Sequence, residues 1–260
     1  MNALLLGDIF GIPGSRAIFM GLKPLVKKYR ADFVIANGEN IADGFGITPD
    51  LAESLLSQGI AVITTGNHVW QKREILPALG SREGLLRPAN YPPGVPGKGF
   101  CVIDVKGEKI AVINLQGREK MSSIDCPFRS AKEILKRVRQ ETRSVFIDFH
   151  AESTEEKEAL AFFLDGSVTA IVGTHTHVQT ADERILPKGT AYITDLGMTG
   201  PGSSVIGVST ETAIRRSLTQ MPLKMDAADS EAVICGVAVQ FRPDQGRALS
   251  IERFRESLVC

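Results

Sequence analysis

The chain has 260 residues, enough for one large domain or two small ones, and a chain of this length buries a core without disulfide or metal staples. Thirty basic and thirty acidic residues balance, so nothing in the composition suggests a polybasic surface for nucleic acid or an anionic membrane. The four cysteines form no CxxC pair, which excludes a zinc ribbon and a dithiol redox motif and fits a reducing compartment.

The N-terminal stretch MNALLLGDIF lacks the basic segment of a signal peptide, and its apolar run is brief. No stretch of the sequence approaches the roughly 18 apolar residues that a membrane-spanning helix requires. We therefore expect a soluble, cytoplasmic protein.

Short apolar runs without alternation predict strands that are buried on both faces. In chain order these runs are 3–6, 33–36, 61–64, 144–149, 168–172 and 191–195. Two further pairs of runs predict antiparallel hairpins. These pairs are 100–105 with 109–114, and 232–242 with 247–255.

Helices are expected between most of these strands, over 15–29, 48–58, 69–79, 130–141, 153–164 and 210–220. Ser15, Thr48 and either Ser153 or Thr154 are the predicted N-caps, and Pro49 fits the first helical position after Thr48. Pro24 lies inside the first helix and should kink or split it. Segments rich in glycine, proline or polar residues predict loops over 11–14, 87–99, 116–129 and 198–207, the last of them flexible.

The order of these elements indicates an α/β protein with a mixed sheet, or with two packed sheets covered by helices. We expect a single domain over residues 1–260. The segment 116–129 has little periodicity and is interpreted as a surface loop or a small lid.

Five of the predicted strands end directly before residues that can bind a metal. These residues are Asp8, Glu39 with Asn40, Asn67 with His68, His150, and His175 with His177. In open α/β sheets, ligands bind beyond the carboxyl ends of the strands, so the five strand ends predict one shared site. The set uses every histidine in the chain.

Each of these residues alone has an ordinary structural explanation. An aspartate or a Gly-Asn pair after a strand is common turn chemistry, and buried, hydrogen-bonded histidines are frequent. Their joint occurrence favours a metal site. Imidazoles with carboxylate and amide oxygens, and no thiolate, suit Fe, Mn, Zn, Co or Ni. The donors suffice for two ions bridged by a glutamate, and two metals ~3.5–4 Å apart are the usual arrangement for phosphoester hydrolysis.

This series of motifs resembles the calcineurin-like metallophosphoesterase superfamily, with three departures. Phe10 stands where a metal-binding histidine is usual, Glu39 where an aspartate is usual, and Val69 where an acidic residue often follows Asn-His. These departures match the bacterial YmdB-like phosphodiesterases, described as 2′,3′-cyclic-nucleotide 2′-phosphodiesterases. The likeness runs from LLLGDIFG through NGEN and TTGNHVW to GTHTHVQTAD and ITDLGMTGP.

The resemblance implies a sandwich of two packed mixed β-sheets flanked by helices, and a role for each motif residue. Asp8 and His177 would hold a first metal. Asn67, His150 and His175 would hold a second, with Asn40 as an additional candidate. Glu39 would bridge the metals and His68 would be the general acid. His175 and His177 would thus be split between the two ions. The implied metals are iron or manganese, with zinc as an alternative.

The implied reaction is hydrolysis of 2′,3′-cyclic nucleotides to 3′-nucleotides by a metal-bound hydroxide. The expected partner is a small cyclic nucleotide or other phosphodiester. We expect no membrane association and no extended nucleic-acid-binding surface. The sequence leaves open whether the chain forms a homo-oligomer. A phosphomonoesterase, such as a nucleotidase or protein phosphatase, would use the same ligands. Because Phe10 stands where a metal-binding histidine is usual, a second hypothesis is a non-catalytic regulator that binds nucleotide or RNA. We expect loops 87–99, 116–129 and 198–207 to form the substrate pocket. Arg118 and Arg129 are candidate phosphate contacts. Both are also consistent with ordinary surface arginines.

Overall fold

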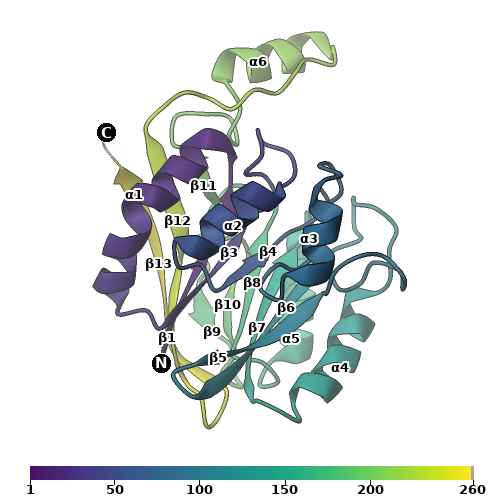
Figure 1. Cartoon of the computed structure of the whole chain (residues 1–260), viewed down its shortest axis with the longest axis vertical. Coiled ribbons are helices and arrows are strands. Elements are labelled where there is room, and N and C mark those ends of the chain that lie inside the picture. Colours follow the sequence, from purple (N-terminus) through teal and green to yellow (C-terminus); the bar gives the residue numbers. More distant parts are fainter. Residues whose placement is uncertain (259–260) are drawn as a thin grey trace.

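The computed structural model describes residues 1–258 and is a sandwich of two mixed β-sheets with helices on the outer faces (Figure 1). Cys260 lies outside the described residues. The first sheet has the strand order β2 (Asp8–Ile9), β11 (Met198–Pro201), β12 (Ala232–Arg242), β1 (Asn2–Leu6), β3 (Phe33–Asn37) and β4 (Val62–Thr64), and β13 (Arg247–Leu258) also pairs with β12. The second sheet has the order β5 (Phe100–Val105), β6 (Glu108–Gln116), β7 (Ser144–His150), β8 (Ala170–Thr174), β10 (Ala191–Ile193) and β9 (Arg184–Ile185). The predicted α/β class with two packed mixed sheets is confirmed.

The layers follow from the alternation of side chains along buried strands. Leu4 and Leu6 of β1 pack with the helices outside the first sheet, whereas Leu5 points the other way, into the core between the sheets. In the second sheet Phe146 joins the central core, and Ile147 packs on the outer helices. Both faces of the strands are therefore buried, which explains their continuous apolar runs.

Six helices lie in the described part of the chain. They are α1 (Gly11–Tyr29), α2 (Pro49–Ser57), α3 (Ile75–Ser81), α4 (Pro127–Val138), α5 (Thr154–Leu164) and α6 (Thr210–Thr219). Two predicted caps are confirmed, since the Thr48 side chain accepts a hydrogen bond from Leu51 N and the Ser153 side chain accepts one from Glu156 N. Within residues 1–258, no helix combines the length and the apolar character needed to cross a membrane.

The start of the first helix differs from the prediction. The helix begins at Gly11, so Ser15 lies inside it and is not the N-cap; Phe10, with an extended backbone, takes that position. Gly14 N already donates to Phe10 O, which closes the first turn within the predicted loop. The predicted split at Pro24 is also wrong, because the helix continues to Tyr29 with buried apolar residues on both sides of the proline.

The predicted bounds of two further helices and of one loop also differ from the structure. The predicted helix over 69–79 is reduced to α3, since turns closed by Val69 N to Gly66 O and Gln71 N to His68 O follow the site residues. Helix α4 starts at Pro127, where a proline suits the first turn. The segment 198–207, expected to be a flexible loop, contains the fully buried strand β11, which pairs with β2 and β12.

Candidate metal centre

Parallel pairing aligns the strand ends that carry the predicted site residues. Strands β1, β3 and β4 run parallel in the first sheet, and β7 and β8 run parallel in the second. Their carboxyl ends meet at one edge of the sandwich, and the structure brings together all eight predicted residues. These are Asp8, Glu39, Asn40, Asn67, His68, His150, His175 and His177.

Close approach of the motifs depends on Gly66. A Cβ atom at this position would lie 2.1 Å from His150 Cδ2 and 2.4 Å from Glu39 Oε2. Any larger residue would therefore push apart the two side chains that the sheets bring together. The glycine before Asn67 and His68 is thus part of the site.

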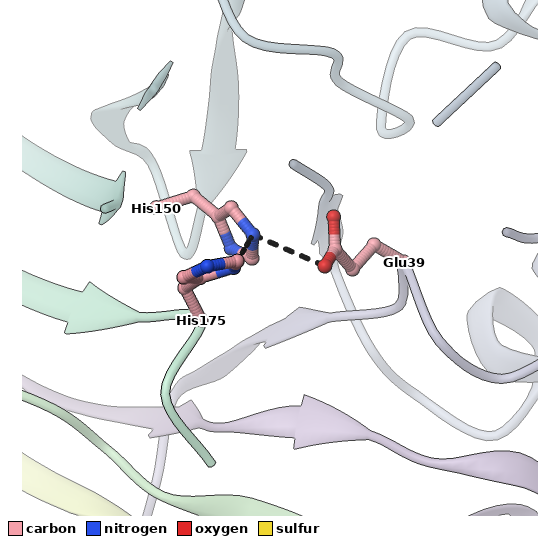
Figure 2. A group of neighbouring side chains, drawn as sticks. All are labelled: Glu39, His150 and His175. Atoms are coloured by element: carbon pink, nitrogen blue, oxygen red, sulfur yellow. Dashed lines mark hydrogen bonds and ion pairs between the residues drawn. The ribbon is translucent and has the colours of Figure 1, made fainter. Parts of the chain in front are cut away.

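One half of the site is centred on His150. Its Nε2 atom lies 3.0 Å from each of Asn67 Oδ1, Glu39 Oε1 and His175 Nδ1. One ring nitrogen can donate or accept a single hydrogen bond, so it cannot satisfy three such neighbours. Figure 2 shows Glu39, His150 and His175 pointing toward one another, and their donor atoms lie within 4.8 Å of each other. Two imidazoles, a carboxylate and an amide oxygen fit a transition-metal ion.

The other half of the site contains Asp8, Asn40 and His177. His177 Nε2 lies 3.8 Å from Asp8 Oδ1, and Asn40 Nδ2 lies 3.4 Å from the same oxygen. The buried ring of Phe10, in place of the usual histidine, packs edge-on against His177 with the centroids 5.5 Å apart. This half therefore offers fewer donors and an apolar wall.

His68 lies at the rim, between the two halves and solvent. Its side chain is 24% exposed, and its Nδ1 atom lies 2.8 Å from Asn40 Oδ1. Its backbone N–H donates to Glu39 Oε2 at 3.3 Å. Within residues 1–258 its Nε2 atom makes no hydrogen bond, so this nitrogen is free to face a substrate.

Hydrogen bonds behind the site fix the orientation of His150. Its Nδ1 atom lies 2.9 Å from Thr174 Oγ1, which donates to Asp148 Oδ1 at 2.7 Å. Asn37 Nδ2 and the Thr64 hydroxyl also donate to the buried Asp148 carboxylate. These contacts direct His150 Nε2 toward the site, as in many metal centres. Sequence reasoning missed Asp148, although a charged residue inside the apolar run 144–149 was a usable signal.

The two histidines of the predicted HxH pair lie on a strained turn. His175 has φ 104° and His177 has φ 65°, both in a region that residues other than glycine rarely occupy. Asp8 Oδ2 accepts from His175 N at 3.1 Å, and Asp195 Oδ2 accepts from Thr176 N at 3.2 Å. The turn therefore depends on carboxylates that are distant in sequence.

Burial and mutual charge interactions shift the pKa values of the clustered side chains in different directions. Burial disfavours the charged form of His150, but the carboxylates of Glu39 and Asp8 outweigh it and raise the pKa of His150 to about 9. Burial and the neighbouring His150 lower the pKa of His175 to about 3. Burial raises the pKa of Asp8 to about 6, whereas His150 and His68 hold the pKa of Glu39 well below its usual value despite burial. Glu39 is therefore favoured as a carboxylate and His175 as a neutral imidazole, the forms in which these groups bind a metal cation.

The two candidate arginines lie in other surroundings. Arg118 is exposed and lies against Glu156 and Cys126, and Arg129 lines a cavity beside α4. Neither position supports a phosphate contact at the cluster.

Two packed mixed sheets, with oxygen and nitrogen donors gathered at the ends of their parallel strands, define a fold of the calcineurin-like metallophosphoesterase type. The model of one family, the YmdB-like proteins, matches residues 4–254, and the chain belongs to this family.

Three relatives illustrate how far the likeness extends. The 2′,3′-cyclic-nucleotide 2′-phosphodiesterase of Bacillus subtilis is 46% identical over 253 residues, covering 97% of this chain and 96% of the relative. A hypothetical protein from Thermus thermophilus has a crystal structure with a TM-score of 0.92 and 41% identity, covering 99% of each chain. A structure described as a novel phosphatase from Mycoplasma pneumoniae has a TM-score of 0.92 and 35% identity, covering 99% of this chain and 93% of its own.

Proposed function

We propose that this chain is a binuclear-metal phosphodiesterase that hydrolyses 2′,3′-cyclic nucleotides to 3′-nucleotides. The observation that carries the proposal is the convergence of the eight motif residues on one point, with Glu39 between the two halves. The Bacillus subtilis relative, whose name states this activity, supports the choice of substrate.

The geometry supports a division of the ligands between two metals. Asn67, His150 and His175 would hold one ion, because their donor atoms face one another at 3.0 Å. Asp8 and His177 would hold the other, and Glu39 would bridge. Iron or manganese is proposed, with zinc as the alternative, since the donors are nitrogen and oxygen. When bound, two such ions activate a water molecule and neutralise charge on the phosphoryl oxygens.

Asn40 and His68 act at the leaving-group side. Asn40 Oδ1 accepts from His68 Nδ1 at 2.8 Å, so we assign Asn40 to orienting His68 in preference to binding a metal. His68 Nε2 then faces the substrate and donates its proton to the departing ribose 2′-oxygen. A general acid placed in this way typically contributes about 10²–10⁴-fold to the rate.

We also propose that residues 1–260 act as one domain and that the segment 116–129 covers the site. The shared core between the sheets supports the first statement, since Leu5 of β1 and Phe146 of β7 belong to it. For the second, Gly117 N donates to the carbonyl of the site residue His150 at 2.9 Å, which places the start of the segment beside the site; its last three residues belong to α4.

The test combines metal analysis with a panel of substrates. Protein purified without chelator should contain two metals per chain and should convert adenosine 2′,3′-cyclic phosphate to the 3′-nucleotide, identified by chromatography. Glu39→Gln, which removes the bridging charge while keeping the size, should lower both metal content and turnover. Faster hydrolysis of mononucleotides than of cyclic nucleotides would favour a phosphomonoesterase. Nucleotide binding without turnover in metal-loaded protein would favour the non-catalytic alternative.

A further inference from the structure

A cavity of about 590 Å³ lies beside Phe45, whose ring contacts the His68 imidazole. The start of α1, residues 42–45 and residues 224–229 line it. Phe45 separates this cavity from His68: its ring meets the imidazole edge-on, with the centroids 5.0 Å apart, and remains 39% exposed. The cavity therefore begins one aromatic ring away from the proposed general acid.

The cavity has a fixed position relative to the site. Gly11 N and Gly44 N both donate to the carbonyl of Asn40, at 3.0 and 3.1 Å. Two of the walls, the start of α1 and the loop that contains Phe45, are thus tied to the residue that orients His68. A molecule held in the cavity therefore has a fixed position relative to Asn40, whose side chain contacts the His68 ring.

We propose that this cavity binds the nucleoside part of the substrate, with the base against Phe45. The inference rests on the proposed phosphodiesterase function, because the leaving 2′-oxygen belongs to the same ribose that carries the base. A nucleoside whose phosphate lies at the metals must therefore extend from the His68 side. Exposed aromatic rings are common platforms for bases, since every base has a flat apolar face.

The size and charge of the cavity favour a neutral occupant. Its volume lies in the range of ~300–1,000 Å³ that is usual for small-molecule sites. Three basic residues of the lining are balanced by three acidic ones, and the pairs Lys72 with Asp43 and Lys224 with Asp226 lie 3.8 and 2.7 Å apart. An RNA chain would bring several phosphates into a lining without net positive charge. A mononucleotide brings only its neutral base and sugar there.

The apolar part of the lining lies where the base would be placed. Ile12 is 59% exposed and lines the cavity together with Phe45 and Met225. A second cavity of about 430 Å³ adjoins the first, because the two share the lining residues Ile12, Arg16, Ala42, Asp43 and Lys72. This location differs from the three loops expected from the sequence.

The test compares two substrates that differ only in the base. Adenosine 2′,3′-cyclic phosphate carries the base, and ribose 2′,3′-cyclic phosphate does not. For Phe45→Ala, the preference for the nucleotide, measured as the ratio of the two kcat/KM values, should fall about tenfold through KM. Phe45→Trp should retain the preference. The matched control is Phe162→Ala on α5, which removes a 54% exposed phenylalanine away from the cavity and should leave the ratio unchanged.

A binding measurement separates this inference from the proposed function. Adenosine should bind the metal-free wild-type protein and should bind Phe45→Ala more weakly, as followed by saturation-transfer NMR. If Phe45→Ala slows both substrates equally, the ring acts only through His68 and the inference is overturned. If the wild type hydrolyses neither substrate, the proposed function fails, and loss of adenosine binding in Phe45→Ala would still support the cavity. If Phe45→Ala binds adenosine as tightly as the wild type does, the proposed nucleoside site is overturned.

Discussion

Lys157 Nζ lies 2.8 Å from Asp195 Oδ2 in the interior of the protein, where both side chains are 1% exposed. The same oxygen accepts from Thr176 N, between the two site histidines, and Asp195 Oδ1 accepts from Gly197 N at 2.9 Å. Gly173 makes room for this pair, because a Cβ atom there would lie 2.9 Å from Lys157 Cδ. The ion pair therefore supports the strained turn that presents His175 and His177.

Loss of one partner should destabilise the protein and loosen the turn. Lys157→Met leaves the Asp195 carboxylate buried without its cation, and breaking a buried pair in this way costs ~3–5 kcal/mol. We expect this loss in urea unfolding, together with a lower metal content of the folded protein. The double variant Lys157→Met with Asp195→Asn removes both charges but keeps an acceptor for Thr176 N, and should regain most of the stability. A single variant as stable as the wild type would contradict this role.

Removal of the proposed general acid should have an effect that depends on the leaving group. His68→Ala should lower kcat for adenosine 2′,3′-cyclic phosphate by about 10²–10⁴-fold. The loss should be much smaller for bis-p-nitrophenyl phosphate, because p-nitrophenolate leaves without a proton. Metal content should not change, since His68 is placed outside the ligand set. Wild-type rates on the cyclic nucleotide would exclude the acid role.

The hydroxyl behind His150 should influence metal affinity without touching the metal. Thr174→Val removes the group that bonds His150 Nδ1 and Asp148, while it preserves the shape of the side chain. Loss of such a supporting contact typically lowers metal affinity about 10–100-fold. Competition with a chelator measures the change. Thr174→Ser keeps the hydroxyl and should retain wild-type affinity; equal weakening in both variants would point to packing instead.

Asp182 should make stability depend on pH. Burial opposes its ionisation, but hydrogen bonds donated by Thr180 Oγ1 and Thr194 Oγ1, both at 2.6 Å, outweigh burial and lower the pKa of Asp182. Because the folded pKa lies below the unfolded value of ~3.9, the carboxylate stabilises the fold above that pH and loses this effect as the pH falls through the folded pKa. Asp182→Asn should therefore be less stable than wild type at pH 7, with a difference that shrinks below about pH 4. A difference that stays constant with pH would argue against ionisation as its source.

The central strands could be predicted from sequence because a strand buried on both faces is a continuous run of apolar residues. Runs such as 33–36 and 144–149 need no knowledge of the partner strand. Strand β11 has no such apolar run, since Gly200 and Pro201 are typical of loops. It is a strand because Gly200 pairs with Val233 of β12. Such pairing is a property of the assembled sheet.

The same distinction applies to the site. Its eight residues were predictable because each follows a recognisable strand and the ends of parallel strands meet. Lys157 was not, because it lies in a helix beside Glu155, Glu156 and Glu158, where the pattern indicates a solvent-exposed face. Its partner Asp195 is 38 residues away, and only the fold brings the two together.

Helix α6 has no buried residue and stands away from the two sheets in Figure 1. The residues that lead into α6, however, contact the candidate metal centre. Ile206 O lies 2.9 Å from His177 Nδ1, and a Cβ atom at Gly207 would lie 2.8 Å from the Phe10 ring. The carbonyl thereby selects which imidazole nitrogen of His177 faces Asp8. For protein engineering, the outer turns of α6 are a suitable place for an insertion or a fluorescent label. An insertion should avoid residues 206 and 207, because it would displace the backbone carbonyl that contacts His177 Nδ1.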